Sequence, residues 1–314
     1  MRDITARYGV CKQSGLASPA MSMYGFEQSR RQANAHIDDT ATMNSAITYL
    51  FVPGDRPDRF SKAFTSGADR IIIDLEDAVR PDEKSRVREM LPDAGIDWSR
   101  TTLRINDAGS PCFEEDLKLL AQVPVLSVML AKTETTDSLD RILNAAGRPV
   151  ALLPLIETVE GLDKLDALLS LPEVHQAAFG HLDFALDLGS APDAEALLFA
   201  RSRLVMRSRL AGKEPPVDGV TADIRDEAAL LEDARRAKRL GFGGKLLIHP
   251  SQISPVREVF LPSAEEQAWA QRVVEAISNS RSGAVSLDGK MIDKPVEAAA
   301  RRILAQKEEK GLTC

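Results

Sequence analysis

Between residues 47 and 260 one pattern repeats eight times: a short apolar run, a turn, and then a segment whose apolar residues have helical spacing. Apolar runs of this length are typical of strands that are buried on both faces. The predicted strands are 47–52, 70–75, 101–105, 125–130, 150–156, 177–180, 218–222 and 245–248. Strict alternation predicts an α/β fold with a parallel sheet, and eight units predict a closed (β/α)₈ TIM barrel. An open doubly wound sheet is disfavoured because no Gly-x-Gly-x-x-Gly sequence follows the first strand.

The chain of 314 residues divides into three predicted parts. Residues 1–44 are polar and aperiodic, so we interpret them as an N-terminal extension with the composition of a disordered segment. Residues 45–260 hold the barrel, and residues 261–314 form a C-terminal helical segment that opens with the capping-box sequence Ser263-x-x-Glu266. This segment is too small to bury a core of its own, so we expect it to pack on the barrel or on a neighbouring subunit.

Composition excludes several classes of protein. The net charge is −7, which gives no indication of a surface for nucleic acid. Three cysteines without a Cys-x-x-Cys spacing predict neither a disulfide framework nor a zinc site, which fits a reducing compartment. No apolar run approaches the roughly 18 residues of a membrane span, and no secretory signal precedes the first strand. We therefore expect a cytoplasmic protein without nucleic-acid or membrane partners.

Two predicted strands in the middle of the chain are each followed by a carboxylate. Glu157 comes directly after 150–156, and Asp183 lies three residues after 177–180. If these strands are neighbours, their ends lie about 5 Å apart, and two carboxylates at that spacing can share one Mg²⁺ or Mn²⁺ ion. The alternative is that Glu157 begins a helix and Asp183 caps a loop.

Further polar residues stand at the ends of other predicted strands, where barrels of this kind place their active sites. Arg104 lies near the end of the third strand and Lys132 follows the fourth. Glu76 and Asp77 follow the second strand; they either contact metal-bound water, orient Arg104, or cap the next helix. Lys132 either contacts a carboxylate of the substrate or forms an ion pair with Glu157.

Six short motifs follow one another along the chain. They are L-F-V-P-G at 50–54, D-L-E-D-A-V at 74–79, L-R-I-N at 103–106, P-L-I-E-T at 154–158, F-G-x-x-D at 179–183 and G-F-x-G-K-x-x-I-H-P-x-Q at 241–252. In this order they resemble the citrate lyase beta-subunit-like proteins of the HpcH/HpaI aldolase superfamily. The resemblance implies a Mg²⁺-dependent lyase that makes or breaks a carbon–carbon bond in an acyl thioester such as citryl-CoA or malyl-CoA, through a metal-stabilised enolate. The partner substrate would be a small carboxylic acid.

The resemblance also implies roles for individual residues. Glu157 and Asp183 would hold the metal, and Arg104 would bind the carboxylate of the substrate as a catalytic residue. From their positions in the sequence we also expect Glu157, Glu76 and Asp77 to contact the substrate. Asp293, in the Met-Ile-Asp sequence of the C-terminal segment, would be an acid–base group that reaches the site of a neighbouring subunit. Because Asp293 would reach a neighbouring subunit, the resemblance also implies a homo-oligomer, which we expect to be a trimer or a multiple of a trimer.

Other functions stay open on the sequence alone. The protein could be a citrate lyase subunit that acts on an acyl-carrier-protein thioester, a malyl-CoA thioesterase, or a non-catalytic assembly subunit. Leu182 stands before Asp183 where relatives carry an acidic residue, and we expect this departure to affect the choice of substrate more than the metal.

Overall fold

The computed structural model describes residues 46–279, 285–287 and 290–311. The predicted N-terminal extension, residues 1–44, lies outside this range. Within the described chain, no helix combines the length and the apolar character that crossing a bilayer requires.

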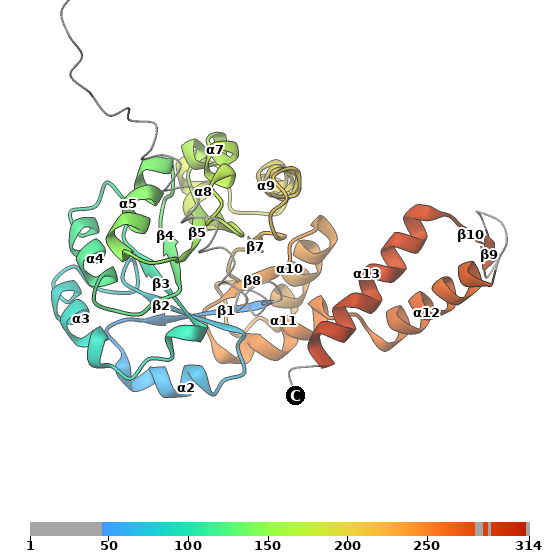
Figure 1. The fold of residues 1–314 in the computed structure, drawn as a ribbon, viewed down its shortest axis with the longest axis horizontal. Coiled ribbons are helices and arrows are strands. Elements are labelled where there is room, and N and C mark those ends of the chain that lie inside the picture. The colour runs from blue at the N-terminus through green and yellow to red at the C-terminus, as the bar shows by residue number, and fades with distance from the viewer. Residues whose placement is uncertain (1–45, 280–284, 288–289, 312–314) are drawn as a thin grey trace, which may run out of the picture. The chain divides into compact units, whose positions relative to one another are not determined.

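Eight parallel strands form a closed barrel in chain order, with helices around it (Figure 1). The strands are β1 (Thr48–Pro53), β2 (Arg70–Asp74), β3 (Thr101–Ile105), β4 (Ser127–Leu130), β5 (Ala151–Ile156), β6 (Ala178–Phe179), β7 (Val217–Asp218) and β8 (Gly244–Leu247). Thr48 pairs with Lys245, so the last strand closes onto the first. The predicted (β/α)₈ barrel is therefore confirmed.

Helices follow the strands and cover the outer surface of the barrel. They are α2 (Phe60–Phe64), α3 (Lys84–Met90), α4 (Phe113–Leu120), α5 (Thr136–Ala146), α6 (Val159–Asp163), α7 (Leu165–Ser170), α8 (His181–Leu188), α9 (Leu198–Leu210), α10 (Glu227–Leu240) and α11 (Ile253–Phe260). Short 3₁₀ turns add η2 (Pro57–Arg59), η3 (Leu91–Asp93), η4 (Trp98–Arg100) and η5 (Pro250–Gln252). Gly241, with φ of 100°, takes the left-handed conformation that ends α10.

The core has two layers because side chains alternate across each strand. Ile72 belongs to the cluster inside the barrel, together with Met129 and Leu246. Its neighbours Ile71 and Ile73 belong to the larger cluster between the barrel and the helices. Both faces of the strands are therefore apolar, which explains why the sequence shows continuous apolar runs.

The region around the sixth and seventh strands differs from the prediction. The sixth strand was expected over 177–180, but β6 has two residues and α8 begins at once at His181. Asp183 therefore lies in the first turn of a helix and not in a loop. Likewise, β7 covers Val217–Asp218, whereas 218–222 was expected.

The C-terminal segment contains α12 (Ala264–Ser278), β9 (Val285–Leu287), β10 (Lys290–Ile292) and α13 (Lys294–Gly311). Ser263 and Glu266 form the expected capping box of α12. Contrary to expectation, the segment buries a small apolar cluster of its own, which includes Val273 and Ile292. That the segment as a whole packs on the barrel or on a neighbouring subunit stays a prediction.

Candidate active site

Charged side chains from four neighbouring strands meet at the carboxyl ends of those strands. Arg104 belongs to β3, Glu76 follows β2, Lys132 follows β4, and Glu157 follows β5. Hydrogen bonds and ion pairs join these four residues into one network. The network lies at the end of the barrel where active sites of this fold are found.

Arg104 is buried and held by carboxylates. Its Nε and Nη2 donate to the two carboxylate oxygens of Asp74 at 2.7 and 2.5 Å, and its Nη1 lies 2.9 Å from Glu76. Burial opposes the charge of the guanidinium, but Asp74 and Glu76 outweigh that effect and raise the pKa of Arg104. The ring of Phe51 lies beneath the guanidinium carbon at 4.9 Å. Arg104 is thus a fixed cation with a planar fork, the group that suits a carboxylate ligand.

Asp74 also shapes the loop that follows β2. Its carboxylate accepts hydrogen bonds from the backbone N–H groups of Glu76 at 2.9 Å and Ala78 at 3.1 Å. The same carboxylate therefore fixes both Arg104 and the loop that carries Glu76 and Asp77. Partial burial and the neighbouring Glu76 raise the pKa of Asp77 to about 6, while its side chain keeps access to solvent.

Glu157 is a carboxylate almost without access to solvent, at 2% exposed. Burial raises its pKa to about 8, although the N–H of Lys132 and the charge of Arg104 work in the opposite direction. Oε1 accepts the N–H of Lys132 at 2.7 Å, and no described residue donates a hydrogen bond to Oε2. A buried carboxylate with one unbonded oxygen fits a cation ligand.

Asp183 comes to the same edge of the barrel as Glu157. The N–H of Gly180 donates to the carbonyl of Ile156 at 2.9 Å, which sets the start of α8 beside the end of β5. Among the described residues, no group of three or more His, Cys, Asp or Glu side chains could hold a metal. A donor set of two carboxylates fits Mg²⁺, which commonly takes one or two carboxylates and completes its shell with water or substrate. The pairing of Glu157 with Asp183 stays a prediction.

A family model described as HpcH/HpaI aldolase/citrate lyase matches residues 48–250, from the first strand to the start of η5. The chain belongs to this family. The resemblance given by the six motifs is confirmed, and so is the prediction of a carbon–carbon lyase.

Relatives in the HpcH/HpaI aldolase/citrate lyase family align over most of the chain. A citrate lyase subunit beta-like protein of Mycobacterium tuberculosis is 35% identical over 268 residues, which cover 83% of this chain and 95% of the relative. Mitochondrial citramalyl-CoA lyase of Rattus norvegicus is 32% identical over 284 residues, 81% of this chain and 84% of the relative. The solved structure of CitE from M. tuberculosis, in complex with magnesium, acetoacetate and coenzyme A, has a TM-score of 0.75 at 34% identity, and covers 83% of this chain and 98% of the solved one.

Asp293, the predicted acid–base residue of this family member, is exposed between β10 and α13. Its Oδ1 accepts the N–H of Val296 at 3.3 Å, so the carboxylate caps α13. Within the described part of the chain, no hydrogen bond or ion pair joins Asp293 to the barrel. Its role at a neighbouring subunit's site stays a prediction.

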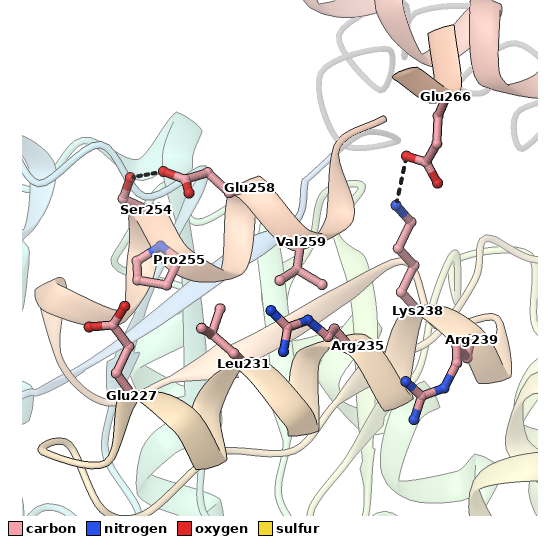
Figure 2. Close-up of a pocket in the computed structure, with 10 residues that line it drawn as sticks. All are labelled: Glu227, Leu231, Arg235, Lys238, Arg239, Ser254, Pro255, Glu258, Val259 and Glu266. Atoms are coloured by element: carbon pink, nitrogen blue, oxygen red, sulfur yellow. Dashed lines mark hydrogen bonds and ion pairs between the residues drawn. The ribbon is translucent and has the colours of Figure 1, made fainter. Parts of the chain in front are cut away.

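A groove on the outer surface contains none of the residues of this network. It has a volume of about 780 Å³ and lies between α10 and α11 (Figure 2). Arg235, Lys238 and Arg239 line it, but so do three glutamates, and one of them, Glu266, lies 3.5 Å from Lys238. Because its positive and negative charges balance, we assign no ligand to the groove.

Proposed function

We propose that this protein is a Mg²⁺-dependent lyase that cleaves or forms a carbon–carbon bond in a CoA thioester of the citryl-CoA or malyl-CoA type. The observation that carries the proposal is the juxtaposition of the buried carboxylate Glu157 with the fixed cation Arg104 in one network. The proposal is supported by one relative that is named citramalyl-CoA lyase and by the CitE complex, which contains both magnesium and coenzyme A.

Glu157 and Asp183 are the residues that would hold the metal. When bound, Mg²⁺ supplies Lewis-acid stabilisation of negative charge that develops on substrate oxygens. The buried surroundings of Glu157 strengthen such electrostatic effects, because few water molecules can screen them.

Arg104 would bind the carboxylate of the small-acid partner. Asp74 occupies the Nε–Nη2 edge of the guanidinium, so the substrate is left with the end that Nη1 shares with Glu76. Glu76 and Asp77 would border this position. Asp77 keeps access to solvent and can accept a hydrogen bond from a hydroxyl or from a bound water.

Asp293 would transfer a proton to or from the acyl carbon or the hydroxyl, as a positioned carboxylate can. The proposal includes a homo-oligomer, a trimer or a multiple of one, in which Asp293 of one subunit serves the site of another. It also includes a cytoplasmic location, since three cysteines without a disulfide framework fit a reducing compartment.

The test is thioester chemistry with and without metal. Acetyl-CoA or propionyl-CoA is incubated with glyoxylate or oxaloacetate, with Mg²⁺ or with EDTA, and the products are identified by mass spectrometry. We expect Mg²⁺-dependent condensation that disappears in Glu157→Gln and persists in the control Glu160→Gln, an exposed glutamate of α6. Metal-dependent release of free CoA would indicate a thioesterase. If no reaction occurs although Mg²⁺ binds, the result would point to a carrier-protein thioester as the substrate. If Mg²⁺ does not bind either, the result would point to a non-catalytic assembly subunit.

The shared site is tested by mixing two inactive variants. Glu157→Gln and Asp293→Asn are unfolded together, refolded together and assayed. Activity reappears if one subunit supplies Glu157 and another supplies Asp293. A mixture that stays inactive, although light scattering shows mixed oligomers, contradicts the shared site and leaves the metal site untouched.

A further inference from the structure

We propose that Lys132 is a positioning residue with two separate tasks: its backbone N–H orients Glu157 for the metal, and its ammonium group sets the charge around Arg104. The inference rests on the proposed function and deepens it, because it couples the metal carboxylate to the arginine that binds the small acid. Two parts of one residue make the two contacts, so substitutions can separate them.

The backbone of Lys132 is unusual. With φ of 43°, it is the one non-glycine residue at positive φ among those the structure describes. A residue with a Cβ atom is disfavoured in this left-handed conformation, and such residues persist where the surroundings fix them. Here the neighbours on both sides are held: Ala131 N–H donates to Ile105 O at 3.3 Å, and Thr133 N–H donates to Leu155 O at 3.2 Å.

The left-handed turn aims the N–H of Lys132 at Glu157. The distance from N to Oε1 is 2.7 Å, and this is the hydrogen bond that Glu157 receives from the described residues. It leaves Oε2 turned towards Gly180, at the start of the helix that carries Asp183. A peptide N–H orients a carboxylate without adding a full positive charge that would compete with a cation for the same group.

The side chain of Lys132 turns to a different carboxylate. Its Nζ lies 2.8 Å from Oε1 of Glu76, and Oε2 of Glu76 lies 2.9 Å from Nη1 of Arg104. The ammonium group therefore shares Glu76 with Arg104. Without it, Glu76 would bind Arg104 alone, and the site would hold one positive charge fewer for an anionic substrate.

Two matched variants separate the tasks. Lys132→Gly and Lys132→Val both remove the ammonium group, so they have the same charge. Glycine accepts positive φ freely, whereas a β-branched residue is strongly disfavoured there, so valine displaces the N–H that Glu157 needs. We expect Lys132→Val to bind Mg²⁺ about 10-fold more weakly than Lys132→Gly, the usual size of a lost outer-shell contact.

The loss of the ammonium group has effects of opposite sign on the two ligands. In Lys132→Gly we expect Mg²⁺ to bind at least as tightly as in the wild type, since the site is more negative. Glyoxylate, as the probe acid, should bind about 10-fold more weakly, which matches the loss of one charge-assisted contact. A residue that served only stability would weaken both ligands together.

The experiment is calorimetric titration of the whole protein with Mg²⁺ alone, and then with glyoxylate at saturating Mg²⁺. Circular dichroism confirms that each variant is folded, and Lys132→Ala replaces the valine variant if that one is not. Lys164→Ala, an exposed lysine after α6, is the control and should match the wild type. Equal Mg²⁺ affinity in the glycine and valine variants overturns the first task. Unchanged glyoxylate affinity in Lys132→Gly overturns the second. Failure of the wild type to bind Mg²⁺ would instead overturn the proposed function.

Discussion

Gly180 lies directly against Glu157. An ideal Cβ atom on Gly180 would lie 2.7 Å from Cβ of Glu157 and closer still to its Oε2. The φ of Gly180 is −88°, which any residue can adopt, so space and not backbone conformation requires glycine here. The glycine at the end of β6 therefore lets the carboxylate at the end of β5 lie beside the first turn of α8.

Gly180→Ala should displace Glu157. We expect Mg²⁺ affinity to fall about 10-fold and activity to fall with it, because an added methyl group pushes the carboxylate out of place. Calorimetric titration with Mg²⁺ measures the effect. Gly109→Ala is the control, since a Cβ there meets the side chain of Asp107 in a loop, and it should bind Mg²⁺ as the wild type does. Unchanged Mg²⁺ affinity in Gly180→Ala would show that Glu157 does not hold the metal in this orientation.

Asp74→Asn tests the buried ion pair that fixes Arg104. The NH₂ group of asparagine replaces one of the two oxygens that accept hydrogen bonds from the guanidinium. Arg104 therefore keeps its charge but loses one acceptor and the negative charge of its partner. Breaking a buried pair in this way costs about 3 kcal/mol or more of unfolding free energy. Urea denaturation measures it.

Asp58→Asn is the matched control for that change. Arg56 and Asp58 form the same two-pronged pair, with Nε at 3.0 Å and Nη2 at 2.9 Å, but on the surface. Because solvent screens exposed pairs, the control should change stability little. If Asp74→Asn and Asp58→Asn lower the unfolding free energy equally, burial does not decide the strength of the Arg104–Asp74 pair.

Binding of Mg²⁺ should release a proton from Glu157. Burial raises the pKa of this carboxylate from about 4.5 in the unfolded chain to about 8, so the metal-free protein favours its protonated form at neutral pH. Because the folded protein holds this proton more tightly than the unfolded chain, protonation of Glu157 stabilises the fold. The stabilisation is complete below the unfolded pKa and is lost as the pH rises through 8. A cation needs the ionised form, so Mg²⁺ affinity should rise with pH up to about 8 and then level off.

Calorimetry in buffers of different ionisation enthalpy measures the released proton. At neutral pH we expect close to one proton for each Mg²⁺ bound, and the same in the control Glu160→Gln. An affinity that is flat between about pH 6 and pH 8 would contradict the raised pKa of Glu157.

The sequence predicts the positions of site residues in the fold better than it predicts the contacts between their side chains. Glu157 could be placed at a strand end because it directly follows the continuous apolar run of β5, and Arg104 because it lies one residue before the end of the buried strand β3. The helix α8 was missed because β6 has two residues and no turn separates it from the helix. An apolar run that passes directly from strand to helix carries no signal for the boundary.

Apolar patterns in the sequence do not predict contacts between individual atoms. The spacing of Lys132 after β4 gives its position but not its positive φ, which depends on neighbours that are distant in sequence. Lys245 is another case: its side chain is buried and donates to the carbonyl of Gly219 at 2.5 Å, and the sequence gives no sign of that contact. A lysine inside a strand pattern can face either solvent or the layer of helices, and the period of two alone does not say which.

His181 gives the last prediction, because it is a buried base at the start of the helix that carries Asp183. It lies against Gly219, and its Nδ1 has no hydrogen-bond partner among the described residues. Burial, and after it the charge of Arg201, lowers the pKa of His181 from about 6.5 to about 4. Folding therefore favours the neutral ring, so its contribution to stability is complete above pH 6.5 and is lost as the pH falls towards 4. We expect His181→Asn to flatten the fall in unfolding free energy over this window, as measured by urea denaturation at a series of pH values. His249→Asn is the control, because His249 is an exposed N-cap residue and asparagine is also favoured at that position. If unfolding free energy depends on pH in the His181→Asn variant as it does in the control and the wild type, His181 is not the group that protonates.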